Sequence, residues 1–426
     1  MRRATDMILY TARRALTQDD VGDIEDGAAV LVHDGVIEWV GRAADFPSAD
    51  YAHDLERIDL GAATLLPGLI DAHVHLAFDG GPAPVERMMA ESDPQQVALM
   101  LRSARELLSV GVTTARDLGA RSYLDVVVRD AIADGTARGP RILTSGSPIT
   151  VTGGHCWFMG GEADGELEVR KLVRRHHRAG VDGIKVMSTG GFMTAGSAPW
   201  YAQYDELVLR AAVEEAHRVG KKVAAHAHGV EGIDRAVRAG VDTLEHCSFV
   251  HPDGSHAVVP ELADRIAASD SYVSPTLNFR VAEYIERSGG IYRPPLMDLV
   301  ARGAKIIVST DSGIDEVPHY GYVGALEVMN GLGMPARDVL ASATSIAADA
   351  LGIAHITGRL RPGLAADILA VEADLDTSLT ALRQPILILA RGEEFTPDRF
   401  APLRAMFSDG AASAAAHPGH AHEESR

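Results

Sequence analysis

The chain of 426 residues has little cysteine and no long apolar run. Its two cysteines, Cys156 and Cys247, cannot form the set of disulfides that stabilises small secreted domains, which favours a reducing compartment. The first residues, MRRATDMILYTARRAL, carry positive charge but lack the apolar centre of a signal peptide. No stretch approaches the roughly 18–20 apolar residues of a membrane-spanning helix. We therefore expect a cytoplasmic protein without membrane contact.

Positive charge is also scarce, because 40 lysines and arginines stand against 59 aspartates and glutamates, for a net charge of −19. Nucleic acids and anionic membrane surfaces attract basic patches, so neither is an expected partner. An anionic small molecule is not excluded, since one local site can differ in sign from the whole chain. With 46% hydrophobic and 23% charged residues, the composition is that of a globular protein large enough for more than one domain.

Both ends of the chain are rich in short β-strand patterns. Near the start, AAVLVHDGVIEWVG places two β-prone runs around an Asp-Gly pair, which is a strong hairpin signal. Near the end, ADILAVEADL and PILILARGEEF have the same character. We predict that residues 1–65 and 356–405 pair into a small β-sandwich domain, with residues 66–355 inserted between them. Residues 406–426 lack a core pattern and are predicted to form a flexible tail.

The middle of the chain alternates short apolar runs with helical patterns. The runs include TLLPGLIDAHVHL, GVTTARDLG, RILTSG, VDGIKVMSTGG, KKVAAHAHG, VDTLEHCSF, SYVSPTL and AKIIVSTDSG. Several helical patterns end at a glycine, which supplies the left-handed cap of a helix. This α/β pattern predicts a (β/α)8 TIM barrel for residues 66–355. An open doubly wound sheet is the alternative, but no G-x-G-x-x-G follows the first strand.

Residues that can bind metal lie in or just after five of these runs. They are His73 and His75, Lys185, His226 and His228, His246, and Asp311. Strand ends meet at one face of such a barrel, and side chains two apart on a strand point the same way. Each residue alone has an ordinary explanation, such as a solvated lysine, a core histidine or a helix cap. Their co-occurrence favours a centre for a divalent transition metal.

The motifs PGLIDAHVHL, GIKVMSTGG, HAHG, LEHCSF and STDSG resemble the amidohydrolase superfamily of metal-dependent hydrolases. The resemblance is greatest to the imidazolonepropionase-like branch, which includes prolidase-type dipeptidases and ochratoxin-type amidases. It spans essentially the whole chain and is specific in these motifs but weak in the loops. It implies two divalent metal ions, Zn²⁺ first, with manganese and cobalt as alternatives that the same ligands accept.

The resemblance also implies a role for each candidate ligand. His73, His75 and Asp311 would hold the first metal, His226 and His246 the second, and Lys185, as a carbamate, would bridge both. His228 has the same facing as His226 and stays open as the alternative ligand, although the superfamily pattern favours the first histidine. A carbamate is chemically reasonable because an ammonium cannot bind a cation, whereas a carbamate is a bidentate anion.

The activity implied is that of a binuclear metal-dependent amidohydrolase that cleaves a C–N amide bond of a small molecule, such as a dipeptide or an N-acyl amino acid. A hydroxide shared by the metals would attack the carbonyl, with Asp311 as proton shuttle and His246 as a second catalytic residue. Alternatives on the same site are hydrolysis of a natural-product or xenobiotic amide, a carbamate or a lactone. An inactive amidohydrolase-like scaffold is the alternative of another class. Lys185 argues against a deaminase.

The sequence offers four candidates for substrate binding. His155 lies in the glycine-rich TGGHCW, and His228 could contact a substrate carboxylate. Tyr201, or Tyr204, lies in the long loop GGFMTAGSAPWYAQYDE, a candidate lid. Arg280 follows SPTLN and could pair with a carboxylate. A small-molecule substrate is the expected partner, and a homo-oligomer is compatible with the sequence.

Overall fold

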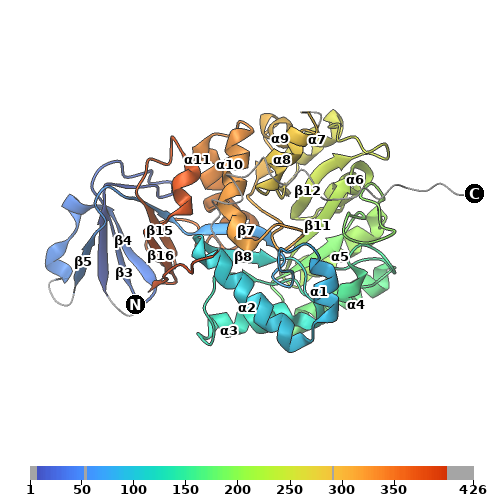
Figure 1. Cartoon of the computed structure of the whole chain (residues 1–426), viewed down its shortest axis with the longest axis horizontal. Coiled ribbons are helices and arrows are strands. Elements are labelled where there is room, and N and C mark those ends of the chain that lie inside the picture. The colour runs from blue at the N-terminus through green and yellow to red at the C-terminus, as the bar shows by residue number, and fades with distance from the viewer. Residues whose placement is uncertain (1–6, 52–54, 290–291, 401–426) are drawn as a thin grey trace, which may run out of the picture.

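The computed structural model describes residues 7–51, 55–289 and 292–400. A small β-rich part lies beside a larger α/β body, and the small part contains segments from both ends of the described chain (Figure 1). The predicted tail, residues 406–426, lies outside the described residues.

The small part consists of two sheets. Strand order is β4-β3-β1-β5 in one sheet and β17-β16-β15-β6-β2 in the other. The strands are β1 (Ile8–Ala12), β2 (Arg14–Ala15), β3 (Ala28–His33), β4 (Val36–Arg42), β5 (Glu56–Asp59), β6 (Thr64–Pro67), β15 (Ile368–Val371), β16 (Leu387–Ala390) and β17 (Glu393–Glu394). The predicted hairpin is β3–β4, with Asp34 and Gly35 at φ of 50° and 75°, as a two-residue turn of this kind requires.

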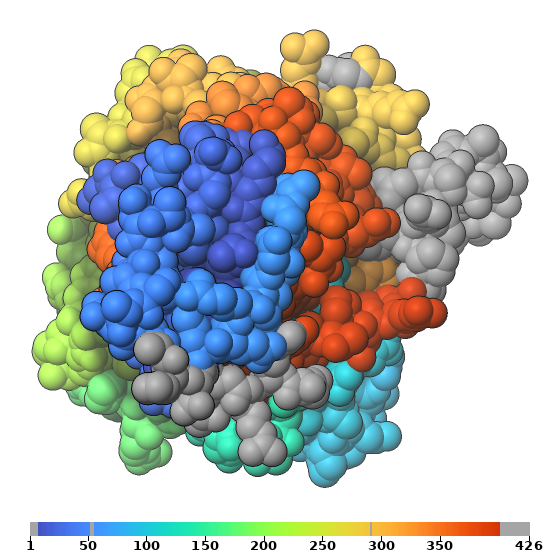
Figure 2. Space-filling view, turned by 90° about the vertical axis from the view of Figure 1, so that its left-hand side faces the viewer, coloured from blue at the N-terminus to red at the C-terminus, as the bar shows by residue number. Residues whose placement is uncertain are grey.

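The two chain ends meet in the second sheet, where β15 pairs antiparallel with β6 and β2 lies parallel beside β6. Figure 2 shows the two ends side by side on this face, early segments in blue and late segments in orange-red. One hydrophobic cluster contains Ile8, Val30, Leu65, Ile368 and Leu389, which come from both sheets. Burial of these apolar side chains favours pairing of the two ends of the chain.

Each of the eight apolar runs of the middle segment contains a strand. The strands are β7 (Leu69–Val74), β8 (Val112–Asp117), β9 (Arg141–Leu143), β10 (Gly183–Met187), β11 (Lys222–Gly229), β12 (Thr243–Val250), β13 (Tyr272–Ser274) and β14 (Lys305–Ile306). Every residue of β7 and of β8 is buried, as expected for parallel strands that are covered on both faces.

These strands are parallel and adjacent in chain order, in a three-stranded sheet β7-β8-β9 and a five-stranded sheet β10-β11-β12-β13-β14. Within the described residues they do not form one continuous eight-stranded barrel. Isolated bridges link the sheets instead, one between Ile149 and Val186 and one between Val74 and Ser312. Ala72 also donates its amide hydrogen to the carbonyl oxygen of Val308 at 3.1 Å, so β7 lies beside the segment that follows β14.

Helices lie between most of these strands. They are α1 (Pro84–Ala90), α2 (Asp93–Ser109), α3 (Leu124–Ala133), α4 (Glu166–Ala179), α5 (Glu206–Arg218), α6 (Val230–Ala239), α7 (Pro260–Ala267), α8 (Arg280–Arg287), α9 (Leu296–Ala301), α10 (Tyr322–Gly331), α11 (Ala336–Ser342) and α12 (Ser345–Leu351). Helices α4 and α6 end at Gly180 and Gly240, whose positive φ allows the left-handed cap. Among the described residues, no helix has both the length and the apolar character that crossing a membrane requires.

Candidate metal centre

The first group of candidate ligands, here called the first cluster, consists of His73, His75 and Asp311. His73 lies in β7, His75 follows that strand, and Asp311 lies beyond β14. The amide of Asp311 donates to the carbonyl oxygen of His73 at 2.9 Å, which brings the two segments together. Nε2 of His73 lies 3.3 Å from Nε2 of His75, and Oδ1 of Asp311 lies 3.3 Å and 3.2 Å from these two nitrogens.

This spacing fits one divalent metal ion. Ligand atoms at about 2.0–2.1 Å from a tetrahedral zinc ion are about 3.3 Å from one another, by the geometry of the tetrahedron. Nδ1 of His73 lies 2.9 Å from Oε2 of Glu245, so this nitrogen carries the hydrogen and Nε2 keeps its lone pair. Oδ1 of Asp311 is buried and accepts no hydrogen bond from the described residues. The donor atoms present therefore match what such an ion needs.

Burial and charge set the protonation states of His73 and Asp311 in the first cluster. Burial, with a smaller contribution from the charge of Lys185, lowers the pKa of His73 to about 4, so its ring is neutral at pH 7. Burial alone would raise the pKa of the Asp311 carboxyl, but the neighbouring His73 and His75 rings and the charge of Lys185 hold it below its usual value. A neutral imidazole and an ionised carboxylate are the forms that bind a metal.

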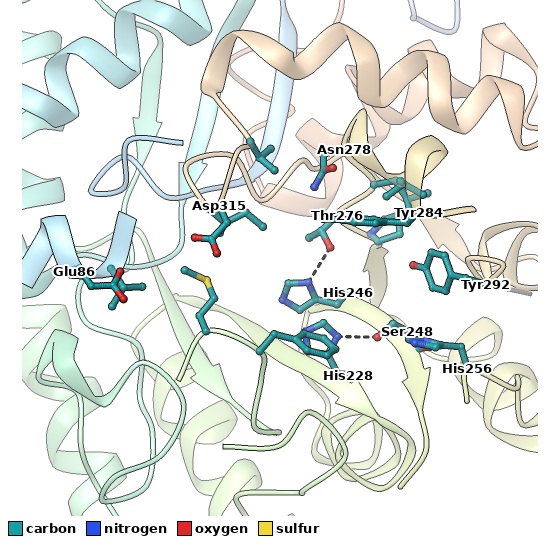
Figure 3. Close-up of a pocket in the computed structure, with 18 residues that line it drawn as sticks. Glu86, His228, His246, Ser248, His256, Thr276, Asn278, Tyr284, Tyr292 and Asp315 are labelled. Atoms are coloured by element: carbon teal, nitrogen blue, oxygen red, sulfur yellow. Dashed lines mark hydrogen bonds between the residues drawn. The ribbon is translucent and has the colours of Figure 1, made fainter. Parts of the chain in front are cut away.

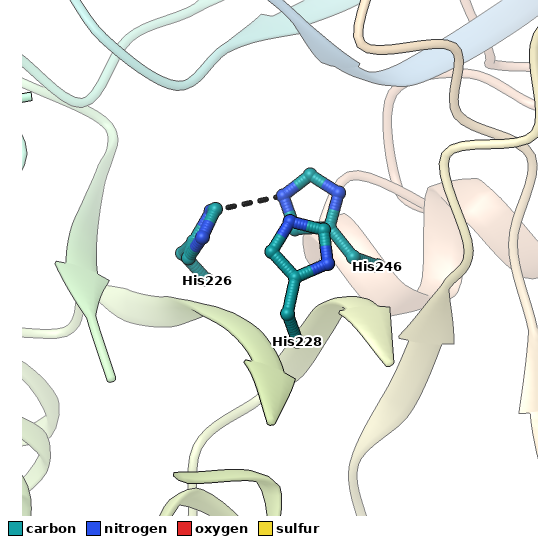
Figure 4. A group of neighbouring side chains, drawn as sticks. All are labelled: His226, His228 and His246. Atoms are coloured by element: carbon teal, nitrogen blue, oxygen red, sulfur yellow. Dashed lines mark hydrogen bonds between the residues drawn. The ribbon is translucent and has the colours of Figure 1, made fainter. Parts of the chain in front are cut away.

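The second cluster consists of His226, His228 and His246, of which the first two lie in the second half of β11 and the third in the middle of β12 (Figure 4). Nδ1 of His226 lies 2.9 Å from Nε2 of His246. The rings of His228 and His246 stack, with centroids 4.2 Å apart and planes at 18°. All three side chains thus face the same small space, and each offers one nitrogen within 4.8 Å of the others.

Hydrogen bonds at the opposite ring nitrogens orient these histidines. Nε2 of His226 donates to the carbonyl oxygen of Gly190 at 2.9 Å, so Nδ1 is the nitrogen with a lone pair. Nδ1 of His246 lies 2.8 Å from Oγ1 of Thr276, which leaves Nε2 facing His226. Nδ1 of His228 lies 2.7 Å from Oγ of Ser248. Partners of this kind commonly fix the orientation of histidines that bind metal.

The three histidines of the second cluster are neutral at pH 7. Burial, reinforced by the neighbouring ring charges, holds the pKa values of His226 and His246 well below the usual value for histidine. The same causes lower the pKa of His228 to about 3. Neutral imidazoles are suited to nitrogen-preferring ions such as Zn²⁺.

Lys185 lies in β10, and its side chain is 1% exposed. Its Nζ has no hydrogen-bond partner among the described residues. Burial lowers its pKa to about 8, although the charges of Glu245 and Asp311 oppose this shift. Its charge contributes to the lowered pKa values of histidines in both clusters. A buried amine without a partner fits a group that is modified or bound in the working protein.

Strained backbone is concentrated at this centre. His246 and Cys247 have φ of 67° and 47°, Thr276 has 51°, and Asp311 has 58°, in the left-handed region that non-glycine residues rarely adopt. Such conformations occur preferentially at functional sites, where the surrounding structure maintains them. At His246 the irregular backbone breaks the alternation of β12. Cys247 is fully buried, and burial raises the pKa of its thiol.

A cavity of about 640 Å³ opens beside the second cluster (Figure 3). His228 and His246 line it, together with Thr276, Asn278 and Ser248. Most of its remaining lining is apolar or aromatic: Val85, Phe192, Met193, Pro275, Leu277, Val281, Tyr284, Tyr292, Ile314 and Val317. Small-molecule sites are usually concave and mainly apolar with a few placed polar groups, and this cavity has that character.

The four candidates for substrate binding have different surroundings. His155 is buried, with its ring centroid 4.5 Å from that of His226, and His228 lines the cavity. Tyr201 is 62% exposed and does not line the cavity, because its loop turns the ring outward beside Trp200. The buried hydroxyl of Tyr204 donates to Ala163.

Arg280 also does not line the cavity. Its guanidinium pairs with Glu316 at 2.9 Å and lies over the ring of Tyr284 at 5.2 Å. The sequence could not show this competition, because Glu316 lies on a separate loop.

Several residues at the metal centre could not be identified from the sequence. Glu245 and Arg116 are buried beneath the first cluster, and Asp71 accepts hydrogen bonds from the amides of His73 and Thr310, both at 3.2 Å. His256 and Tyr292 form part of the cavity wall. The only available signal was the placement of Glu245 directly before a candidate ligand and of Asp71 two residues before another.

Comparison with known proteins places these observations in a family. Residues 64–395 match the model of the amidohydrolase family. The chain is 30% identical to the ochratoxinase of Aspergillus niger over 392 residues, which cover 84% of this chain and 80% of the relative. It is 27% identical to the imidazolonepropionase of Salinispora tropica, over 82% of this chain and 87% of that protein.

Solved structures agree with the sequence comparison. A crystal structure of a Xaa-Pro dipeptidase with methionine bound in the active site superimposes with a TM-score of 0.77 and 26% identity, over 91% of this chain and 99% of that one. The chain belongs to the amidohydrolase family and is a hydrolase. Its relatives imply a TIM-barrel fold and a general dependence on metal.

Proposed function

We propose that the chain is a binuclear metal-dependent amidohydrolase that cleaves a C–N amide bond of a small molecule, such as a dipeptide or an N-acyl amino acid. The observation that supports it best is that ligand-type side chains meet in two clusters, while the buried amine of Lys185 has no hydrogen-bond partner among the described residues. The names of the relatives, an ochratoxinase and a Xaa-Pro dipeptidase, support hydrolysis of amide-type bonds. We also propose that the eight strands close into one barrel and that segments from both ends of the chain form a β-sandwich domain.

In this proposal His73, His75 and Asp311 would hold one ion, His226 and His246 would hold the other, and Lys185, as a carbamate, would supply a further anionic ligand. A bound pair of divalent ions supplies an activated water and polarises the substrate carbonyl. Zinc is the proposed metal because nitrogen ligands predominate. His228 is assigned to the substrate rather than to metal, because it lines the cavity and is less buried than His226.

The protein's own residues position the substrate and transfer the proton. Asp311 accepts the proton of the attacking water at a carboxylate oxygen and gives it to the leaving nitrogen. His246 lines the cavity, so we place the reacting carbonyl beside it. His228 hydrogen-bonds the substrate beside this carbonyl, and the apolar wall of the cavity excludes water from the side chains of the substrate. His155 does not line the cavity, but its ring centroid lies 4.5 Å from that of His226, so it is kept as a second substrate contact. Tyr201 and Arg280, which do not line the cavity, are not part of this arrangement.

One experiment tests the proposed function. The metal-free protein is loaded with Zn²⁺, Mn²⁺ or Co²⁺ and offered dipeptides and N-acyl amino acids with apolar and aromatic side chains, and release of free amine is measured. We expect turnover that a chelator abolishes and added metal restores. A xenobiotic amide such as ochratoxin belongs in the panel, because the cavity is largely apolar and the ochratoxinase is 30% identical. Absence of bound metal would instead indicate an inactive scaffold.

A further inference from the structure

A buried network beneath the first cluster joins Arg116, Glu245 and His73. Oε2 of Glu245 lies 2.9 Å from Nδ1 of His73, and Oε1 lies 2.8 Å from Nη2 of Arg116. Nε of Arg116 donates to the carbonyl oxygen of Ala72 at 2.7 Å, and its Nη1 donates to Oγ1 of Thr243 at 3.1 Å. Arg116 therefore holds the backbone directly before His73, while Glu245 holds the ring of His73.

The fold explains why these side chains meet. Thr243 and Glu245 lie two apart on β12 and face the interior together, while Arg116 reaches them from β8. Glu245 is 0% exposed, and the Arg116 side chain is 8% exposed. The next residue, His246, belongs to the second cluster, so one short segment of β12 serves both clusters.

We propose that Glu245, held by Arg116, is a positioning residue that fixes His73 as a ligand through Nε2. With Nδ1 hydrogen-bonded to a carboxylate, the ring cannot rotate about χ2 without losing a buried charged hydrogen bond, and its Nε2 becomes the more basic nitrogen. A partner of this kind commonly changes metal affinity by about 10–100-fold. The inference rests on the proposed function only in requiring that the first cluster binds a metal.

If the ion pair of Glu245 and Arg116 only filled space in the core, the expected effect on metal binding would differ. Burying a charged pair costs desolvation energy, and apolar residues of similar volume often stabilise a protein equally well. A pair kept only to fill space would affect thermal stability, but would not act on one metal equivalent more than on the other. The distinction can be measured.

The test compares wild type with Glu245→Gln, which keeps the shape and removes the charge. Glu215→Gln is the matched control, since Glu215 is also nearly buried and pairs with Arg174 at 2.8 Å, on α5 away from the clusters. Metal-free proteins are titrated with Co²⁺, and the two equivalents are followed by visible absorption and by chelator competition. The equivalent that belongs to the first cluster is the one that His75→Asn abolishes.

We expect Glu245→Gln to weaken the first-cluster equivalent about 10–100-fold and the other by less than about threefold, with no such loss in Glu215→Gln. Equal weakening of both equivalents, or a loss that Glu215→Gln reproduces, would overturn the inference. Glu245→Gln leaves Arg116 unpaired and could fail to fold for that reason. In that case the double variant Arg116→Gln with Glu245→Gln is tested in its place, with the same expected results.

The tautomer of His73 gives a second readout in the metal-free protein. Nitrogen-15 spectra of histidine-labelled protein should show hydrogen on Nδ1 of His73 in wild type and a mixture of tautomers in Glu245→Gln. An unchanged tautomer would contradict the positioning role. If wild type binds both metals but cleaves no amide, only the proposed function fails, whereas a wild type without metal binding overturns both.

Discussion

Replacing Lys185 by alanine removes the group proposed to supply, as a carbamate, a further anionic ligand to the metal ions. The side chain is buried in β10, and its amine has no hydrogen-bond partner among the described residues, so the variant loses packing contacts but no hydrogen bond. We expect Lys185→Ala to lose bound metal and turnover while it keeps its fold. Short carboxylates such as acetate or propionate, which can occupy the space and bind both ions, should restore part of the activity.

The structure also gives a magnitude for carbamate formation. Only the neutral amine reacts with carbon dioxide, and burial lowers the pKa of Lys185 from 10.5 to about 8. At pH 7 about one amine in ten is then neutral, against about one in 3,000 for an ordinary lysine, which is about a 300-fold gain. The neutral fraction rises with pH and is nearly complete by pH 9, so the reaction should accelerate about tenfold between pH 7 and pH 9.

The assay follows recovery of activity after metal-free protein is mixed with Zn²⁺ at several pH values. Dissolved carbon dioxide is held constant with a gas mixture, because total carbonate would change with pH. Lys222→Ala is the control, since Lys222 lies at the start of the neighbouring strand β11 and pairs with Asp242 at 3.3 Å. Recovery that is independent of carbon dioxide and pH, or two metals retained in Lys185→Ala, would refute the reasoning.

Four further variants test individual residues. Asp311→Asn should keep metal but lose about 10²–10⁴-fold in kcat, because the amide cannot accept the proton; near-normal kcat would remove Asp311 from that role. His226→Asn should lose one of two metals by elemental analysis, whereas His228→Asn should keep both and raise KM; the reverse result would exchange their assignments. Gly191→Ala should lower kcat/KM at full metal content, because its Cβ would lie 2.4 Å from the ring of His155; unchanged kinetics would show that His155 tolerates displacement.

Local signals in the sequence predicted much of the fold. The Asp-Gly pair at 34–35 forms the turn between β3 and β4, since both residues adopt positive φ. Glycines after helical patterns provide the caps at Gly180 and Gly240. These features depend on backbone conformation within a few residues, so a single sequence can show them. Pairing of β6 with β15 was expected from shared composition, although its register was not.

Those residues of the candidate site that are placed by their position on a strand could be predicted from the sequence. Those that are placed by packing between distant segments could not. His73, His75 and Asp311 meet because parallel strands end at one edge. Glu245, by contrast, reads as an ordinary glutamate in the sequence, and its contact with His73 spans 172 positions along the chain. Arg280 illustrates the opposite error, since a charged residue near a strand end pairs with a neighbouring loop instead of facing the cavity.

Anomalous X-ray scattering at the zinc absorption edge, recorded from crystals of zinc-loaded protein, tests the central claim most directly. The account predicts two peaks per chain. One lies among Nε2 of His73, Nε2 of His75 and a carboxylate oxygen of Asp311, and the other lies against the ring nitrogens of His226 and His246. A single peak, or zinc bound only away from these side chains, would contradict the account.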